Sequence, residues 1–267
     1  MSNSSPDTAK LANIQYHQIG KPLPHTDARG KSTGELRYAG DYIMPGMLYA
    51  KVLRSPLASA RLKLLDVTKA RKLPGVSCIL TAADLPDRMA PTDLPGQTGQ
   101  KRTDTDQQIL AREIIRYHGE PLALVAAETL VIAEKAVSLI KFELEKLPVV
   151  SDPFEAMKPG SAVVQGTDNV VADYRIRKGD VEQGFLEADA VIENTYQTQF
   201  IEHAFLEPEV GLSWVDENDV INIRMSTQVI EHFRFVADAL GIPHNKVRIQ
   251  GSMVGGGFGG KEDITVE

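Results

Sequence analysis

The sequence predicts an α+β fold made of two blocks that an irregular segment separates. Strand-like and helix-like segments alternate up to about residue 150, and they alternate again from about residue 171. Between the blocks, the stretch DPFEAMKPGSAVVQGTDN is rich in Pro, Gly and Asp and has no hydrophobic periodicity. The 267 residues, 42% apolar and 24% charged, are enough for one large or two ordinary globular domains.

These patterns predict four regions along the chain. Residues 1–24 are a polar lead-in, residues 25–150 form the first α+β domain, residues 151–170 form a linker, and residues 171–267 form the second α+β block. The sequence contains no internal repeat and no low-complexity segment.

The first block begins with strands and then gains a helix. GMLYAKVLRS and SCILTA have the β-branched and apolar content of strands, and the apolar run Leu122–Glu128 suits a buried strand. LVIAEKAVSLIK follows and predicts a helix, and FELEKLPVV alternates as a strand again. The expected buried face of the helix consists of Ile132, Ala136, Val137 and Ile140.

The second block predicts a helix, a long strand, a hairpin, a second helix and a last strand. DVEQGFLEAD is the short helix and AVIENTYQTQFIEH the long strand. VGLSWVDENDVINIRMST is the hairpin, with its turn at residues 216–219. VIEHFRFVADALG has helical spacing and stops at Gly241, and KVRIQ is a strand that leads into a glycine run.

Composition excludes several classes of function. No apolar run reaches the roughly 18 residues of a membrane span, and the N-terminus lacks the features of a secretory signal. We therefore expect a cytoplasmic protein without a membrane partner. The net charge is −7 and no basic stripe occurs, so we expect no nucleic-acid partner.

The cysteine count limits redox chemistry. The single cysteine, Cys78, has no internal disulfide partner and cannot supply the ligands of an iron–sulfur cluster. It lies in the apolar run GVSCILT, which favours a buried and inert thiol over a reactive one.

The chain ends in VGGGFGGKEDITVE, and two phosphate-binding motifs fail there. Gly255–Lys261 spells G-x-x-x-x-G-K, but the Ser or Thr that would ligate magnesium is replaced by Glu262. The same glycines satisfy G-x-G-x-x-G, but only seven residues follow Gly260, too few for the helix and the distant acid of a dinucleotide site.

Two interpretations of the glycine run remain. The first is a flexible loop without chemistry. The second, which we favour because five glycines surround one aromatic residue, is a loop whose N–H groups line an anionic or oxo ligand, anchored by Phe258.

Taken together, the segments resemble the molybdenum-binding subunit of the xanthine dehydrogenase and aldehyde oxidoreductase family of molybdenum hydroxylases. The likeness covers nearly the whole chain, and it is most specific in STQVIEHFRFVADALGIPHNKVRI followed by GGGFGGKED. It also includes LYAKVLRSPLASARL, YHGEPLALVAAET and IEHAFLEPEVGLSW. The resemblance implies an α/β hammerhead-type domain followed by the first part of a molybdopterin-binding α+β domain.

The resemblance also implies which residues face the cofactor. Gln228 matches a glutamine that hydrogen-bonds an oxo group of molybdenum, without ligating the metal. Gly256, Gly257, Phe258 and Gly259 match the loop that lies against the cofactor, with the backbone of Phe258 and Gly259 beside the oxo ligands. The main alternative for Gln228 is an ordinary polar residue at the start of a helix.

Further roles follow from the same likeness. Glu262 matches the acid that hydrogen-bonds the heterocycle in purine-hydroxylating members, and Phe258 lies beside the substrate as well. Without the motif, Glu262 would be a solvated loop acid. His203 and Glu207 are expected to shape the pocket wall or to satisfy buried hydrogen bonds, and they lack the further ligands that a zinc site needs.

The resemblance places part of the machinery outside this chain. It implies a molybdopterin cofactor, in a form with or without an added nucleotide, and a catalytic glutamate base in sequence that would follow Glu267. It further implies a 2Fe–2S subunit, an FAD subunit and the rest of the molybdenum subunit as partners. No catalytic residue is therefore expected in this chain, and we expect the chain alone to be inactive.

The expected function is hydroxylation of a purine or a related N-heterocycle with water as the oxygen source. Two alternatives stay open. The protein is an aldehyde-oxidising member of the same family, or it is a non-catalytic assembly subunit or truncated fragment that keeps the fold without the metal.

Overall fold

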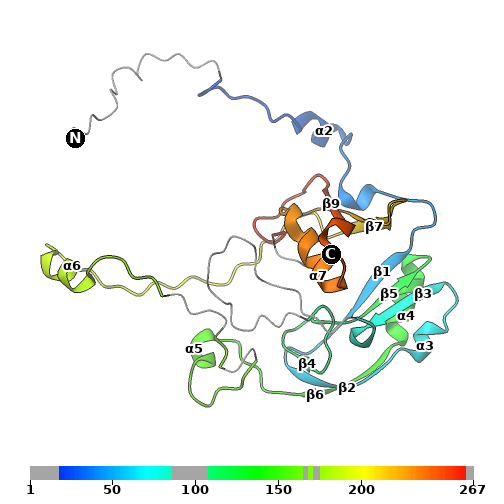
Figure 1. Ribbon diagram of the computed structural model, residues 1–267, viewed down its shortest axis with the longest axis horizontal. Helices are drawn as coiled ribbons and strands as arrows, with labels where there is room; N and C mark the ends of the chain where they lie inside the picture. The colour runs from blue at the N-terminus through cyan, green and yellow to red at the C-terminus, as the bar shows by residue number, and fades with distance from the viewer. Residues whose placement is uncertain (1–17, 86–107, 165–167, 171–174, 263–267) are drawn as a thin grey trace. The chain divides into compact units, whose positions relative to one another are not determined.

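The computed structural model describes residues 18–85, 108–164, 168–170 and 175–262 (Figure 1). The chain divides into two units, Met1–Arg37 and Tyr38–Glu267. In the first unit, the six-residue helix α2 (Ala28–Thr33) ends at Gly34, which has a left-handed φ of 75°. Most of the predicted lead-in lies outside the described residues.

Two antiparallel sheets form the first block of the second unit. One has the strand order β1-β5-β3 and the other has the order β4-β2-β6 (Figure 1). Their bounds are β1 (Tyr49–Arg54), β2 (Ala60–Asp66), β3 (Val76–Thr81), β4 (Ile114–Ile115), β5 (Pro121–Ala127) and β6 (Lys141–Lys146). The short helices of this block are α3 (Thr68–Arg71) and η2 (Ala82–Asp84), whereas η1 (Ala39–Asp41), which precedes β1, contacts β7 (Gly211–Val215) of the second block.

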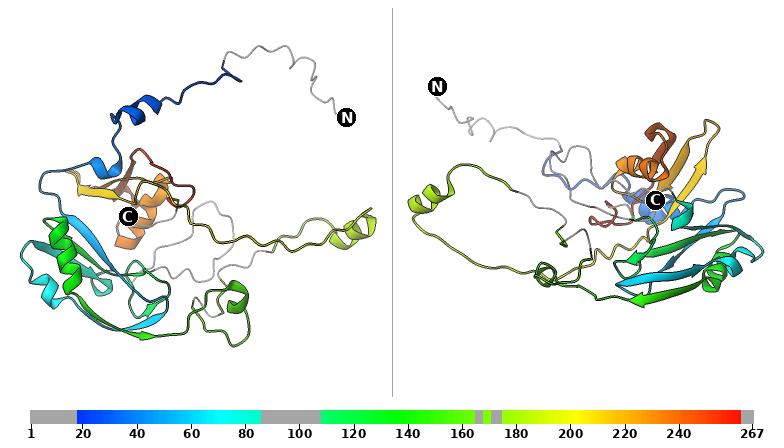
Figure 2. Two further views of the ribbon diagram at one scale, coloured as in Figure 1. Left: turned by 180° about the vertical axis from the view of Figure 1, so that it is seen from behind. Right: turned by 60° about the horizontal axis from the view of Figure 1, so that its bottom comes forward.

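The core of this block lies between β5 and the helix α4 (Leu130–Leu139). Strand β5 is central in its sheet, and its side chains Leu122, Ala123 and Val125 are fully buried. Helix α4 packs against β1 and β5 (Figure 2), with Ala133 and Ala136 fully buried at the contact. Small residues on the helix let its backbone come close to the sheet.

The second block is a three-stranded sheet with the order β7-β8-β9. Strands β7 (Gly211–Val215) and β8 (Ile221–Met225) form an antiparallel hairpin, while β8 and β9 (Val247–Gly251) are parallel. A parallel pair needs a crossover connection. Here it consists of η3 (Ile230–His232), α7 (Phe233–Leu240) and η4 (His244–Lys246).

Local sequence explains the hairpin turn and the end of α7. The Asp216 carboxylate accepts hydrogen bonds from the N–H groups of Asn218 and Val220, and Asp219 adopts a left-handed φ of 61°. Helix α7 ends at Gly241, whose φ is 69°. Both predictions are confirmed. The core of this sheet consists of Ile223, Met225, Val236, Ala237 and Val247.

Two predictions, one in each block, are wrong. The segment 190–203 was expected to be a long strand, but it forms no strand because no described segment pairs with it. Cys78 was expected to be buried, but it is exposed. The pairing of β3 with β5 shifts register between Val76 and Cys78, and Ile79 is the buried residue beside it.

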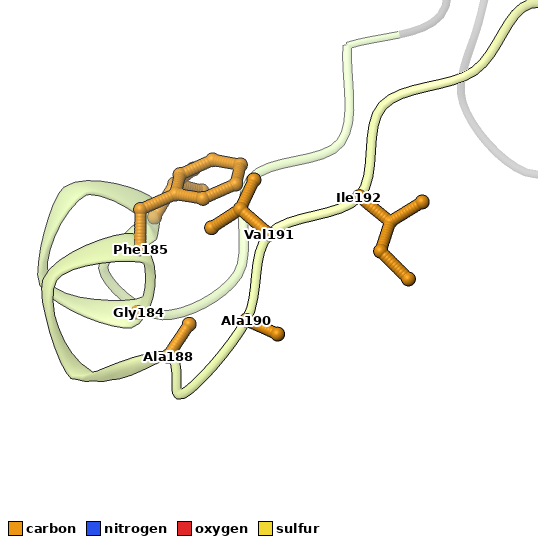
Figure 3. Close-up of a pocket in the computed structure, with 7 residues that line it drawn as sticks. Gly184, Phe185, Ala188, Ala190, Val191 and Ile192 are labelled. Atoms are coloured by element: carbon orange, nitrogen blue, oxygen red, sulfur yellow. The ribbon is translucent and has the colours of Figure 1, made fainter.

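Helix α6 (Val181–Glu187) and the chain that follows it carry exposed apolar side chains. Phe185 of α6 and Val191 lie toward one another across a shallow apolar hollow (Figure 3). None of the residues predicted to bind cofactor or substrate lines this hollow. A further short helix, α5 (Pro153–Ala156), lies within the predicted linker.

No helix among the described residues is both long enough and apolar enough to cross a membrane.

Candidate functional site

The candidate site lies where two parallel strands end at the same edge of a sheet. Ser226, Thr227 and Gln228 follow β8, and the glycine loop, residues 254–262, follows β9. Because β8 and β9 run in the same direction, their carboxyl ends bring these two segments together. Ligand sites of open α/β sheets often form at this edge.

Gln228 is held by hydrogen bonds from the glycine loop on both sides of its amide. Its Oε1 accepts from the N–H groups of Gly259 at 3.0 Å and Lys261 at 3.3 Å, and its Nε2 donates to Glu262 Oε1 at 3.2 Å. Its backbone N–H donates to the Lys261 carbonyl at 2.9 Å. The amide therefore has a defined orientation, with its NH₂ group on the side of Glu262.

Three glycines of the loop are required by close approach. A Cβ atom at Gly257 would lie 2.2 Å from Gln228 Oε1, one at Gly260 would lie 2.7 Å from the ring of Phe205, and one at Gly255 would lie 2.6 Å from Glu207 Cβ. Each contact would displace the loop or its neighbour. The glycines thus serve close packing, which argues against the interpretation of a merely flexible loop.

The backbone between these glycines is strained at an exposed aromatic residue. Phe258 has a φ of 53°, which an L-residue with a bulky side chain rarely adopts, and its side chain is 76% exposed. Ala204, in the segment that faces the loop, has a φ of 51°. Strain of this kind is often kept at functional sites.

Three successive N–H groups of the loop have no acceptor among the described residues. They belong to Gly256, Gly257 and Phe258, whereas the N–H of Gly259 is already bound to Gln228. Successive free N–H groups form a concave patch of positive partial charge that suits an anion or an oxo group. The backbone of Phe258 therefore has a free donor, whereas the predicted donor of Gly259 is already used by Gln228.

A buried ion pair lies beneath the loop. Lys261 Nζ lies 3.0 Å from Glu207 Oε2 and donates to Ser226 Oγ at 2.8 Å, and the two charged side chains are 1% and 10% exposed. Glu207 Oε2 also accepts from the N–H of Gly255 at 2.6 Å. The Lys261 ammonium lies 4.6 Å from the centroid of the Phe205 ring.

This network sets the protonation of Glu207. Burial raises the pKa of the Glu207 carboxyl, but the hydrogen bonds from Ser226, Gly255 and Lys261 outweigh burial and hold the pKa below its ordinary value. Glu207 is therefore an ionised acceptor near neutral pH.

The histidines take different positions. His232 is buried, and its Nε2 donates to the carbonyl oxygen of Glu262 at 2.7 Å, which ties the end of the loop to η3. His203 lies against the loop, within 4 Å of where a Cβ of Gly259 or Gly260 would be. Within the described ranges, no three His, Cys, Asp or Glu side chains group closely enough to hold a metal ion.

The structure brings together Gln228, the glycine loop and Glu262, as the sequence predicted, and the roles of these residues stay predictions. Sequence reasoning missed the residues that hold the loop from below. These are Phe205, Ser226, His232 and Lys261. No local pattern marks Lys261, because lysine side chains are mostly solvated and the partner of this one, Glu207, lies 54 residues earlier in the chain.

Comparison with known proteins identifies two domains in this chain. Residues 33–148 match the a/b hammerhead domain of aldehyde oxidase and xanthine dehydrogenase, and residues 163–267 match the molybdopterin cofactor-binding domain. The predicted α+β class, with a hammerhead domain before a molybdopterin-binding domain, is confirmed.

Curated relatives share about a third of the residues. The chain is 38% identical over 245 residues to the xanthine dehydrogenase molybdenum-binding subunit of Escherichia coli O157:H7, covering 90% of this chain and 32% of that protein. It is 34% identical over 253 residues to the nicotinate dehydrogenase large molybdopterin subunit of Eubacterium barkeri, covering 94% and 57%. The chain thus spans 32% to 57% of the length of these relatives.

A solved structure shows the same fold. The aldehyde oxidoreductase from Desulfovibrio desulfuricans superposes with a TM-score of 0.80 at 29% identity, over 93% of this chain and 28% of that one.

Proposed function

Because the chain belongs to the aldehyde oxidase and xanthine dehydrogenase family of molybdenum hydroxylases, we propose that it forms part of the molybdopterin site of an enzyme that hydroxylates a purine or a related N-heterocycle. The observation that carries this proposal is the contact between Gln228 and Glu262, which joins a candidate cofactor donor to a candidate substrate acceptor. Phe258 is exposed in the same loop.

The residues present fit a cofactor that carries oxo groups. The loop offers the free N–H groups of Gly256, Gly257 and Phe258, and Gln228 Nε2 has a second hydrogen beyond the one bound to Glu262. An uncharged amide donates to an oxo group without competing as a metal ligand. When bound, a molybdenum–pterin cofactor supplies a two-electron redox centre for oxidation of carbon, with water as the oxygen source.

Glu262 is the candidate for substrate recognition. Its carboxylate accepts from Gln228 Nε2 through Oε1, which leaves Oε2 to accept a ring N–H of a heterocycle. A carboxylate there orients the ring and stabilises positive charge that develops on it. The relatives include proteins named for xanthine and for nicotinate, both N-heterocycles, which supports this substrate class.

We place the catalytic base outside this chain. Glu207 is the other carboxylate at the loop, but Lys261, Ser226 and Gly255 occupy its Oε2 and lower its pKa. A carboxylate with a lowered pKa is a weak base. Glu262 is expected to bind the substrate through hydrogen bonds and to leave proton removal to the base.

The chain is proposed to act with further polypeptide. The further polypeptide is the rest of a molybdenum subunit, together with 2Fe–2S and FAD subunits that carry electrons away. The relatives are longer than this chain, and apolar side chains between 76% and 94% exposed support a covering partner. These side chains are Leu186, Ile192, Tyr196, Phe200, Ile201 and Leu206.

The test uses the assembly that a tag on this chain retrieves from its source cell. Molybdenum and pterin are measured per chain, and turnover is measured on purines, on nicotinate and on aromatic aldehydes. Glu262→Gln should lower kcat/KM for the N-heterocycles by about 100-fold and change that for aldehydes little. Glu231→Gln, an exposed carboxyl on η3, is the matched control.

Each proposal has its own contrary result. An equal loss for heterocycles and aldehydes would remove the substrate assignment, and preferential turnover of aldehydes by the wild type would favour the aldehyde-oxidising alternative, which the likeness to an aldehyde oxidoreductase supports. An assembly without molybdenum that survives Gln228→Ala and Glu262→Ala unchanged would favour a non-catalytic subunit.

A further inference from the structure

We propose that Lys261 and Glu207 are positioning residues, whose buried ion pair anchors the glycine loop and, through the Lys261 backbone, orients the amide of Gln228. That the orientation of Gln228 serves a cofactor rests on the proposed function. The ion pair and the hydrogen bonds to Gln228 are contacts within the chain itself.

The side chain of Lys261 is held in place by three hydrogen bonds. Its ammonium group donates to the Glu207 carbonyl and to Glu207 Oε2, both at 3.0 Å, and to Ser226 Oγ at 2.8 Å. An ammonium group has three hydrogens to donate, so these contacts use its full capacity. The Lys261 ammonium group is therefore held by three hydrogen bonds, and its side chain is only 1% exposed.

The backbone of Lys261 contacts Gln228. Its N–H donates to Gln228 Oε1, and its carbonyl accepts from the N–H of Gln228 and, at 3.3 Å, from Thr227 Oγ1. Lys261 therefore hydrogen-bonds both the side chain and the backbone of Gln228, while its own side chain is bound to Glu207 and Ser226. A displacement of Lys261 would be transmitted directly to the amide of Gln228.

Hydrogen bonds and close packing also fix the start of the glycine loop, so the loop cannot easily adjust to such a displacement. Glu207 and Gly255 are joined reciprocally, since each backbone N–H donates to an oxygen of the other residue. A Cβ at Gly255 would lie 2.6 Å from Glu207 Cβ, so the loop begins in direct contact with the carboxylate residue that holds its other end. Glu207 therefore joins the first and the last turn of the loop.

Stability does not explain this ion pair well. Burial of two charges costs desolvation energy, and well-packed apolar residues often replace such a pair at no loss of stability. Glu207 Oε1 is buried and has no hydrogen-bond partner among the described residues, which adds to the cost. A pair kept in spite of this is better explained by the geometry that it imposes.

The first test measures amide hydrogen exchange on the chain. Lys261→Met removes the ammonium group and leaves the Glu207 carboxylate buried without its partner. The double variant, Lys261→Met with Glu207→Gln, removes that charge as well and serves for the measurement if the single variant does not fold. A glutamine at position 207 can still accept from Gly255. In the double variant, the amide of Gly259 and the amide at position 261 should exchange at least about tenfold faster, while Gly255 and Ile223 keep their protection.

A matched variant controls for loss of a lysine. Lys246→Met removes a partly exposed lysine that pairs with Asp219 at 3.8 Å and donates to the Asn218 carbonyl at 3.1 Å, and exchange at Gly259 should stay at the wild-type rate. In the double variant, wild-type exchange at Gly259 and at position 261 would overturn the inference. Equal acceleration at Ile223 of β8 would overturn it too, because the pair would then support the domain in general.

The second test uses the assembly retrieved from the source cell. The double variant should change the line shape of the Mo(V) electron paramagnetic resonance signal and lower kcat about tenfold or more with a smaller change in KM. An unchanged signal and kcat would overturn the positioning role. If the wild-type assembly holds no molybdenum, the proposed function fails, and the exchange experiment alone decides whether the ion pair orients Gln228.

Discussion

Phe258 combines an exposed aromatic ring with a backbone that a glycine would adopt more easily. Phe258→Gly should leave the free energy of unfolding unchanged or raise it by about 1 kcal/mol, because relief of the left-handed strain is partly offset by the larger entropy of unfolded glycine. Turnover by the assembled enzyme should fall. Thermal or denaturant unfolding of the chain, together with steady-state kinetics, checks both expectations.

The buried residue Phe235 is the control for this change. It is 8% exposed on α7, so Phe235→Ala should cost about 3–5 kcal/mol. If Phe258→Gly destabilised the chain to a similar extent, Phe258 would be a packing residue and the ligand-facing role would lose its main support.

Glu120 is a buried carboxyl away from the candidate site. It precedes β5, is 2% exposed, and accepts the N–H of Arg116 at 2.6 Å. Burial raises the pKa of Glu120, and the hydrogen bond and charge of Arg116 offset this only in part. A raised folded pKa means that the native state binds more protons, so this group lowers stability as pH rises from the unfolded value of about 4.3.

Glu120→Gln should therefore gain stability relative to the wild type as pH rises from 4 to 7. Gln can still accept from Arg116 without carrying a charge. Urea unfolding at several pH values measures the difference, and Glu143→Gln, an exposed carboxyl on β6, serves as the control. If the free energy of unfolding of Glu120→Gln fell relative to the wild type between pH 4 and pH 7, the charge of Glu120 would stabilise the fold.

At the scale of elements, the glycine loop is a packed structure. Gly257→Ala would place a Cβ 2.2 Å from Gln228 Oε1, so we expect a loss of about 1–3 kcal/mol and displacement of the Gln228 amide. Gly251→Ala at the end of β9 is the matched control, because nothing lies within 4 Å of its Cβ position and its φ is not left-handed. Equal melting temperatures for the two variants would contradict the packed loop.

The elements also show where sequence patterns succeed and fail. The hairpin of β7 and β8 and the end of α7 were predicted because Asp216, Asp219 and Gly241 act on their own neighbours in the chain. The expected strand at 190–203 failed because a strand is defined by its partner, and no described segment pairs with it. Strand β2 was not predicted, although its residues alternate between apolar and polar from Ala60 to Leu64. The alternation breaks after Leu64, next to the register shift with β6.

At the scale of the whole molecule, the prediction is that this chain alone does not turn over substrate. The chain offers a candidate cofactor loop and a candidate substrate carboxylate, while the other carboxylate at the loop, Glu207, is paired with Lys261. Turnover is measured for the purified chain supplied with molybdopterin and an artificial electron acceptor, and for the assembly from the source cell. Hydroxylation by the chain alone at a rate comparable to that of the assembly would contradict the proposed division of the site.

The sequence by itself determined the α+β class, the hairpin and the C-terminal end of α7, because these depend on local periodicity and turn chemistry. The candidates Gln228, Phe258 and Glu262 came from the resemblance of their motifs to a known family. Only the tertiary structure decided that Cys78 is exposed and that Lys261 is buried against Glu207. The physical reason is distance along the chain. The parallel pairing of β8 with β9 brings together side chains from distant segments, and no local pattern encodes that contact.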